Sequence, residues 1–307
     1  MSSVGWEVDD RAASLRARAY LAFLRLHRDE RAFEGEVHTR RIARKRQAKG
    51  DRPPTLLTRL RHSATASEWA GLTVWTVGLR RTRPRVRVLY LHGGGYLHPL
   101  TADYWRLVRW LARTPAEVVV PAYPLAPDAT VDDAVPALVE LATDLQDRDD
   151  RPLVLMGDSA GGALALVLAR QLADLGHPPA RVVALCPWLD ATLDEAEVSG
   201  LEPTDPMLAE SGLRAAGRWW AGRRAPTDPL VSPLCGELAG LPPLEVLIGD
   251  RDILRPAVDR LAALAEEQGA SLQVLEVPAM FHVWMTRAIP EGRRTRRHLV
   301  ERLRTVP

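Results

Sequence analysis

A ten-residue stretch near the middle of the chain, residues 153–162, constrains the fold more than any other segment. Four apolar residues, 153–156, predict a short buried strand, and the alanine- and leucine-rich run at 163–170 predicts a helix. Between them stands a G-x-S-x-G sequence with Ser159 at its centre. A serine on a tight strand-to-helix turn is typical of a nucleophile elbow. The alternative is a glycine-rich turn in which Ser159 only caps the helix.

The composition indicates a globular chain without a nucleic-acid signature. Of 307 residues, 46% are hydrophobic and 26% are charged, and the formal net charge is only +2. Cys186 and Cys235 lack the spacing of a metal site or a disulfide framework, so we expect reduced thiols. We see neither a signal peptide in residues 1–10 nor an apolar run of the ~20 residues that a membrane span needs. These features predict a cytoplasmic protein without stable membrane association.

Strand and helix patterns alternate along most of the chain. The expected strands are one or two edge strands within 67–80, then 86–91, 118–120, 153–156, 182–185, 244–248 and 272–277. Helices are expected between them, and this alternation predicts a mostly parallel central sheet that is covered on both faces. The alternation of strands and helices stops in residues 191–240, which contain five prolines. This favours a cap or lid that packs over the sheet.

The N-terminal part of the chain predicts a helix over residues 10–35, followed by a strongly basic stretch at 40–52. This stretch is compatible with a solvated helix face, a membrane-surface helix or a nucleic-acid patch. The solvated face is favoured because no aromatic residues are interleaved with the charges and the net charge of the chain is small.

A serine nucleophile needs a base, which is usually a histidine oriented by a carboxylate. In elbow-type hydrolases these partners follow in the order Ser, Asp, His, each at the end of a strand. His282 follows the strand expected at 272–277, and it is the candidate base; a structural histidine is the alternative. Asp250 and Asp252 both follow the strand at 244–248, and they compete for the role of the carboxylate.

Acyl transfer also needs N–H donors for the developing oxyanion. The run His92-Gly93-Gly94-Gly95 follows an earlier strand, and its glycines would let backbone amides converge, with the amide of Ala160 as a further donor. A flexible turn or a phosphate cradle are the alternatives. The P-loop lysine that a phosphate cradle would call for does not follow these glycines.

These motifs resemble those of the hormone-sensitive-lipase-like family of α/β-hydrolases, which are serine esterases with HGGG and GDSAGG sequences. The similarity runs from His92 to Trp284 and includes the YPLAP run at 123–127 and Asp252, three residues after Gly249. It implies an α/β-hydrolase fold, Asp252 rather than Asp250 as the carboxylate, and Gly94, Gly95 and Ala160 as the oxyanion donors.

The resemblance also bears on the organisation of the chain. It implies that residues 1–60 form an N-terminal helical cap segment beside a catalytic domain at 61–307 that carries the 191–240 insertion. It makes a homodimer one candidate assembly, and it implies neither a metal nor an organic cofactor.

The sequence therefore predicts a serine carboxylic-ester hydrolase with the triad Ser159, His282 and Asp252, acting on a small-molecule ester through an acyl-enzyme. An amidase or peptidase with the same triad, and a hydrolase-fold receptor without catalysis, are the alternatives. A cap without a membrane signal favours short-to-medium acyl esters over emulsified triglyceride. Four aromatic residues are candidates for the acyl pocket, with core packing as the alternative: Tyr96, Trp188, Trp219 and Trp220.

Overall fold

The computed structural model describes residues 4–27, 32–113, 116–194 and 196–307. A nine-stranded sheet runs through the centre of the molecule in the order β1-β9-β8-β7-β6-β4-β5-β3-β2. Strands β2 and β3 pair antiparallel with each other, β3 pairs antiparallel with β5, and the other neighbours are parallel. The strands are β1 (Val4–Val8), β2 (Ser63–Trp69), β3 (Leu72–Gly78), β4 (Val86–Leu91), β5 (Ala116–Pro121), β6 (Leu153–Asp158), β7 (Arg181–Leu185), β8 (Leu244–Gly249) and β9 (Leu272–Val277).

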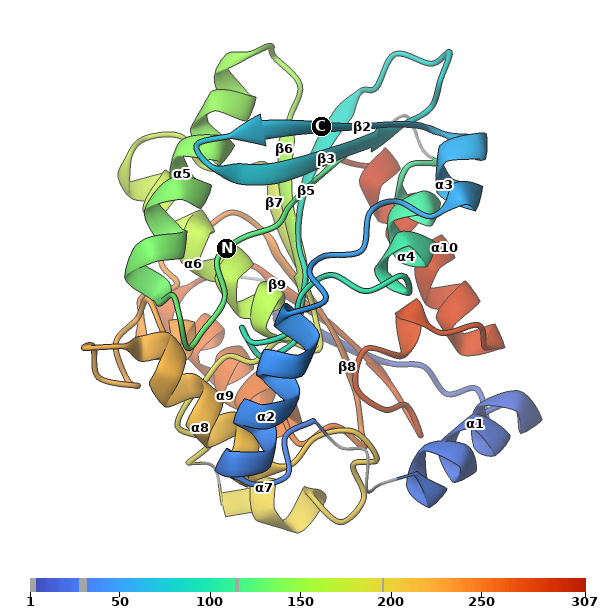
Figure 1. Ribbon diagram of the computed structural model, residues 1–307, viewed down its shortest axis with the longest axis vertical. Helices are drawn as coiled ribbons and strands as arrows, with labels where there is room; N and C mark the ends of the chain where they lie inside the picture. The colour runs from blue at the N-terminus through green and yellow to red at the C-terminus, as the bar shows by residue number, and fades with distance from the viewer. Residues whose placement is uncertain (1–3, 28–31, 114–115, 195) are drawn as a thin grey trace.

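Helices cover both faces of this sheet, as the alternating pattern predicts. Figure 1 shows α5 (Val131–Asp147) and α6 (Ala160–Asp174) on one side, and α4 (Tyr104–Leu111) and α10 (Pro290–Arg304) on the other. Every residue of β4, β6 and β8 is buried, because a parallel strand covered on both faces meets apolar neighbours in both directions. Helix α9 (Arg255–Gln268) joins β8 to β9. The expected α/β-hydrolase fold is therefore confirmed.

The N-terminal segment differs from the single helix expected over residues 10–35. Val4–Val8 forms β1, a strand that pairs in parallel with β9 at the edge of the sheet. The helix that follows is α1 (Leu15–Leu26), and residues 28–31 of the expected helix lie outside the described residues. A five-residue strand at a sheet edge was missed because its only partner lies far along the chain. The segment before residue 61 is thus not purely helical, and the boundary at 60–61 stays a prediction.

The segment after α1 packs against the insertion at residues 191–240. Helix α2 (Glu36–Gln47) carries most of the basic stretch, and the insertion contributes α7 (Ala196–Leu201) and α8 (Glu210–Ala221). Arg218 of α8 pairs with Glu36 at 2.9 Å, and the amide of Gly35 donates to the Ser211 hydroxyl at 3.1 Å. A Cβ on Gly212 would lie 1.9 Å from the Phe33 carbonyl oxygen, so the two segments touch at backbone distance.

The remaining short elements connect these layers. They are α3 (Leu56–Arg61) and two 3-10 turns, η2 (Pro233–Cys235) and η3 (Trp284–Thr286). Among the helices of the described residues, none combines the length and the apolar character needed to cross a membrane.

Candidate active site

Ser159 lies between β6 and α6 in a backbone conformation that non-glycine residues seldom adopt, with φ 53° and ψ −123°. Two glycines make this turn sterically feasible. A Cβ on Gly157 would lie 2.2 Å from the Gly161 carbonyl oxygen, and a Cβ on Gly161 would lie 2.1 Å from that of Leu91. Because backbone atoms block both positions, only glycine fits. The turn has the geometry of a nucleophile elbow and leaves Ser159 5% exposed, in the wall of a cavity that is partly apolar.

Asp252 and His282 come together from the ends of β8 and β9. Nδ1 of His282 and Oδ2 of Asp252 are 2.7 Å apart, and both residues are buried. The partner of His282 Nδ1 is Asp252 and not Asp250. The Oδ1 atom of Asp250 is buried without a hydrogen-bond partner. Burial lowers the pKa of His282, whereas the charge of the Asp252 carboxylate and its hydrogen bond raise it. The raising effects are together the larger, so the pKa of His282 lies above its ordinary value. Among the described residues no hydrogen bond joins the Ser159 hydroxyl to His282, although both line one cavity.

The glycine-rich loop after β4 lies next to the elbow. Gly93 donates its amide to Asp158 Oδ1 at 3.0 Å, so this amide is already engaged. Gly94 and Gly95 take positive φ angles of 108° and 62° and line the same cavity as Ser159. Ala160 is the first residue of α6, where a backbone amide lacks an intrahelical acceptor. The arrangement leaves the amides of Gly94, Gly95 and Ala160 as the candidate oxyanion donors.

The cavity has a volume of about 380 Å³. Ser159, His282 and the glycine loop form its polar wall, and Phe23, Phe33 and Leu208 are among its apolar lining. None of the four aromatic residues considered for the acyl pocket lines it. Tyr96, Trp188 and Trp220 are almost completely buried, and Tyr96 stacks on Trp220 with ring centroids 4.1 Å apart. Core packing, the alternative, therefore accounts for these three rings.

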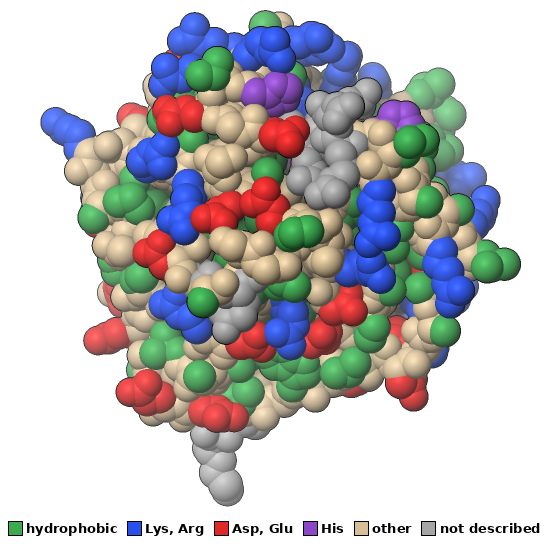
Figure 2. All heavy atoms as spheres, turned by 90° about the horizontal axis from the view of Figure 1, so that it is seen from below, with side chains coloured by type: hydrophobic (Ala, Val, Ile, Leu, Met, Phe, Trp, Pro, Cys, Tyr) green, Lys and Arg blue, Asp and Glu red, His purple; other side chains and the backbone are tan. Residues whose placement is uncertain are grey.

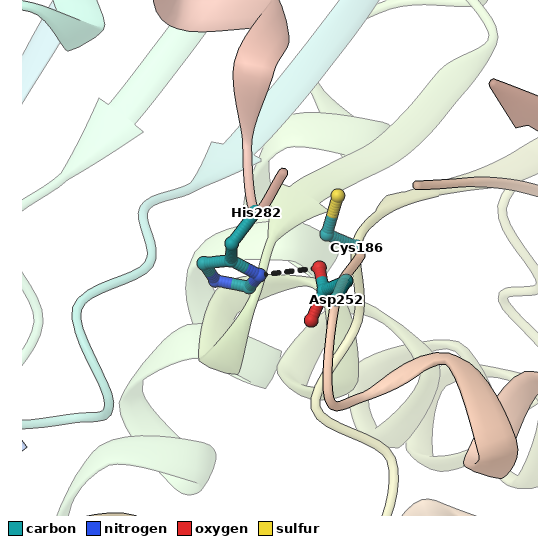
Figure 3. Close-up of side chains that lie close together, drawn as sticks. All are labelled: Cys186, Asp252 and His282. Atoms are coloured by element: carbon teal, nitrogen blue, oxygen red, sulfur yellow. Dashed lines mark hydrogen bonds and ion pairs between the residues drawn. The ribbon is translucent and has the colours of Figure 1, made fainter. Parts of the chain in front are cut away.

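Cys186 lies beside the His282–Asp252 pair, as Figure 3 shows. One ligand-type atom from each of the three residues lies within 4.8 Å of the others, a spacing that a metal ion could bridge. Burial, followed by the charge of Asp252, raises the pKa of the Cys186 thiol, and a protonated thiol is a poor metal ligand. The sulfur instead accepts a hydrogen bond from the Val283 amide at 3.3 Å. Cys186 therefore connects the end of β7 to the loop that carries His282.

Asp158, the residue before the serine, also belongs to the site, although the sequence analysis did not assign it a role. Besides the Gly93 amide, it accepts hydrogen bonds from the hydroxyls of Tyr90 at 2.7 Å and Tyr104 at 3.1 Å. Burial raises the pKa of Asp158 to about 6 despite these donors. Its carboxylate ties the glycine loop to the elbow. The sequence feature that could have identified Asp158 is its position in the G-D-S motif, directly before Ser159.

Asp205 is the second residue that the sequence analysis missed. It comes from the 191–240 insertion, is completely buried, and accepts a hydrogen bond from the Ile253 amide at 3.1 Å, next to Asp252. The amides of Met207 and Leu208 also donate to it, at 2.7 and 2.9 Å. Burial, followed by the charge of Asp252, raises the pKa of Asp205 to about 6. No local motif marks this aspartate, because its partners lie in another part of the chain.

Comparison with known proteins agrees with this geometry. A family model described as alpha/beta hydrolase fold matches residues 88–286. An acetyl-hydrolase of Streptomyces hygroscopicus is 32% identical over 273 residues, which cover 85% of this chain and 87% of that protein. A triacylglycerol lipase of Mycobacterium tuberculosis is 33% identical over 77% of this chain, and the match spans half of the lipase.

Solved structures give the same result. An esterase from the bacterial hormone-sensitive lipase family superimposes with a TM-score of 0.82 at 26% sequence identity, covering 96% of this chain and 99% of that one. A crystal structure of EstE5 soaked by ethyl alcohol reaches a TM-score of 0.84 at 25% identity over 95% of this chain and 98% of that chain. The chain therefore belongs to the α/β-hydrolase fold family, among the esterases and lipases of its hormone-sensitive-lipase-like group.

Proposed function

We propose that this protein is a serine carboxylic-ester hydrolase that works through a Ser159–His282–Asp252 triad and an acyl-enzyme intermediate. The observation that carries the proposal is the strained elbow at Ser159, which shares its cavity with a His282 that is hydrogen-bonded to a fully buried Asp252. A serine, an imidazole and a carboxylate in this order and arrangement are the parts that acyl transfer requires.

The first half of the reaction acylates Ser159. Nδ1 of His282 is engaged with Asp252, so Nε2 is the nitrogen that accepts the Ser159 proton as the hydroxyl oxygen attacks the ester carbonyl. Asp252 stabilises the imidazolium that results. The amides of Gly94, Gly95 and Ala160 bind the oxyanion, and one such donor is typically worth about 3 kcal/mol of the barrier. His282 then protonates the departing alcohol.

The second half returns the enzyme to its starting state. A water molecule attacks the acyl carbonyl, and His282 accepts its proton and passes a proton to the Ser159 oxygen as the acid leaves. The oxyanion donors act in both steps. All atoms of this cycle come from the ester, water and residues of this chain.

The cavity supports a preference for short-to-medium acyl esters. Its volume of about 380 Å³ lies near the lower end of the range for small-molecule sites. The N-terminal segment and the insertion pack together near it, and both contribute lining residues, Phe33 and Leu208 among them. We expect kcat/KM on p-nitrophenyl esters to be highest between acetate and hexanoate and to fall from laurate to palmitate. A rate that rises to palmitate would contradict this preference.

Labelling with a fluorophosphonate probe tests the nucleophile. We expect the probe to attach to Ser159 of the folded protein and to abolish hydrolysis of p-nitrophenyl butyrate in parallel. The Ser159→Ala variant should be neither labelled nor active, whereas a matched Ser199→Ala variant on α7 should behave as the unmodified protein. Full activity of Ser159→Ala, or labelling elsewhere with the same loss of activity, would overturn the proposal.

A further inference from the structure

One cation in the wall of the active-site cavity has no counter-charge. Arg46, in the last turn of α2, lines the cavity, and its guanidinium forms no ion pair or hydrogen bond with any described residue. Its neighbour Gln47 anchors this end of the helix, since its side-chain amide donates to the carbonyl oxygens of Leu97 and Ala126 at 2.8 Å each. Arg46 is therefore an exposed side chain on a well-anchored helix end at the cavity wall.

His98 lies in the same wall with both ring nitrogens unsatisfied. It is 5% exposed, and neither Nδ1 nor Nε2 has a hydrogen-bond partner. Its ring packs against Phe33, with centroids 5.4 Å apart. Burial, followed by the charge of Arg46, lowers the pKa of His98 to about 3, so the ring stays neutral and offers one N–H donor at neutral pH. Buried polar groups without partners are rare in folded proteins. His98 contributes to the cavity wall, but both of its ring nitrogens are shielded from the cavity space.

The other charged groups in the described lining of the cavity have ion-pair or hydrogen-bond partners. Asp103 pairs with Arg287 at 2.8 Å, and Asp158 accepts hydrogen bonds from two tyrosine hydroxyls and the Gly93 amide. Among the charged groups of the described lining, the Arg46 guanidinium is therefore the one without a hydrogen-bond or ion-pair partner. The exterior carries charges of both signs: Figure 2 shows basic and acidic side chains intermingled on the face of the molecule seen from below.

We propose that the cavity accepts esters that carry a carboxylate remote from the scissile bond, and that Arg46 binds this carboxylate. A guanidinium offers a carboxylate two parallel N–H donors. A carboxylate bound there would give the Arg46 guanidinium the partner that it lacks among the described residues. The inference rests on the proposed function, because it names the class of substrate that Ser159 would attack.

A pair of isosteric esters tests the inference. Monoethyl succinate and ethyl isocaproate have the same shape, but only the succinate carries a carboxylate at the end of the acyl chain. Initial rates of both are measured by titrating the released acid at constant neutral pH. The variants are Arg46→Met, Arg46→Lys and His98→Phe, with Arg44→Met as the control, since Arg44 lies on the same helix, is exposed and does not line the cavity.

We expect Arg46→Met to lower kcat/KM for monoethyl succinate about tenfold, the scale of a charge-assisted hydrogen bond in a partly exposed site. Its kcat/KM for ethyl isocaproate should change less than about twofold, which also shows that the variant is folded. Arg46→Lys should retain most of the succinate activity, and Arg44→Met should resemble the unmodified protein. His98→Phe should affect the two esters alike, because the His98 nitrogens are shielded from the cavity.

The inference would be overturned if Arg46→Met changed kcat/KM for the two esters equally. It would also be overturned if the unmodified protein hydrolysed monoethyl succinate no faster than the Arg46→Met variant does. If ethyl isocaproate is hydrolysed in a Ser159-dependent manner in that case, the proposed function stands and only the carboxylate subsite falls. If neither ester is hydrolysed by the unmodified protein, the proposed function is overturned and the inference with it.

Discussion

Nδ1 of His282 and Oδ2 of Asp252 lie 2.7 Å apart at the ends of neighbouring parallel strands, and the aspartate is completely buried. A buried carboxylate at this distance orients the imidazole and leaves its other nitrogen available. The strand arrangement also explains how two residues 30 positions apart in the chain can be hydrogen-bonded. The carboxyl ends of β8 and β9 meet at the same edge of the sheet.

Replacing Asp252 with asparagine should remove this orientation while preserving the shape of the side chain. We expect kcat on p-nitrophenyl butyrate to fall roughly 10³- to 10⁴-fold with little change in KM, because the imidazole takes the wrong tautomer. Asp250→Asn is the matched control, and its kcat should stay within about threefold of the unmodified value. A strong loss in Asp250→Asn with little effect of Asp252→Asn would reverse the assignment.

The pH dependence of kcat/KM should report the His282 imidazole, which accepts a proton only when neutral. The raised pKa of His282 predicts a rise of activity with a midpoint above 6.5. Asp205 contributes to this shift by its charge, so Asp205→Asn should move the midpoint to lower pH. Asp174→Asn at the end of α6 is the control and should leave it unchanged. An unshifted midpoint in Asp205→Asn would exclude this electrostatic link.

The same shift has a consequence for stability. The folded state binds the His282 proton more tightly than the unfolded chain, since its pKa is raised above 6.5. The contribution to the free energy of unfolding is therefore fully present below pH 6.5 and is lost as the pH rises through the folded pKa. Urea unfolding of the unmodified protein and of His282→Gln across this range measures the difference, which should shrink as the pH rises. A difference that is constant with pH would contradict the shift.

Cys186 should matter through its hydrogen bond with the Val283 amide. Cys186→Ala leaves this buried N–H without a partner, and we expect a loss of about 1–3 kcal/mol in the free energy of unfolding. Cys186→Ser keeps an acceptor and should recover part of the loss. Cys235→Ala, at an exposed position, is the control. Thermal unfolding measures all three, and equal stability of the Ala and Ser variants would show that the sulfur acts only by filling space.

Gly161 should tolerate no side chain. A Cβ there would overlap the carbonyl oxygens of Leu91 at 2.1 Å and His92 at 2.6 Å, and backbone atoms of a central strand cannot move aside. We expect Gly161→Ala to lower the free energy of unfolding by about 3 kcal/mol or more and to abolish activity. Gly200→Ala in α7 meets no atom within 4 Å, and it should be neutral or stabilising by up to about 1 kcal/mol. Similar effects of the two substitutions would contradict the packing argument.

Local chemistry in the sequence was sufficient to predict the elbow at Ser159, His282 after a later strand and a mostly parallel sheet covered by helices. It left Asp250 and Asp252 as alternatives, and the family resemblance favoured Asp252 and the α/β-hydrolase fold. Each of these signals lies within a few neighbouring residues: an apolar run, a glycine pair, a polar residue directly after a strand. Such signals are encoded locally because strand, turn and helix preferences depend on adjacent side chains. The burial of Tyr96 and Trp220 against each other could not be predicted in this way.

The tertiary structure alone decided which groups meet across the fold. It placed Asp252 rather than Asp250 against His282, added β1 to the sheet edge, brought Asp205 from the insertion to the Asp252 turn, and put Arg46 and His98 in one cavity wall. These contacts join segments that are distant in the chain, and their partners become neighbours only once the sheet has assembled. The sequence by itself identified the candidate catalytic groups, because each follows a recognisable strand or turn. The packing of the N-terminal segment against the insertion shaped the cavity that these groups line.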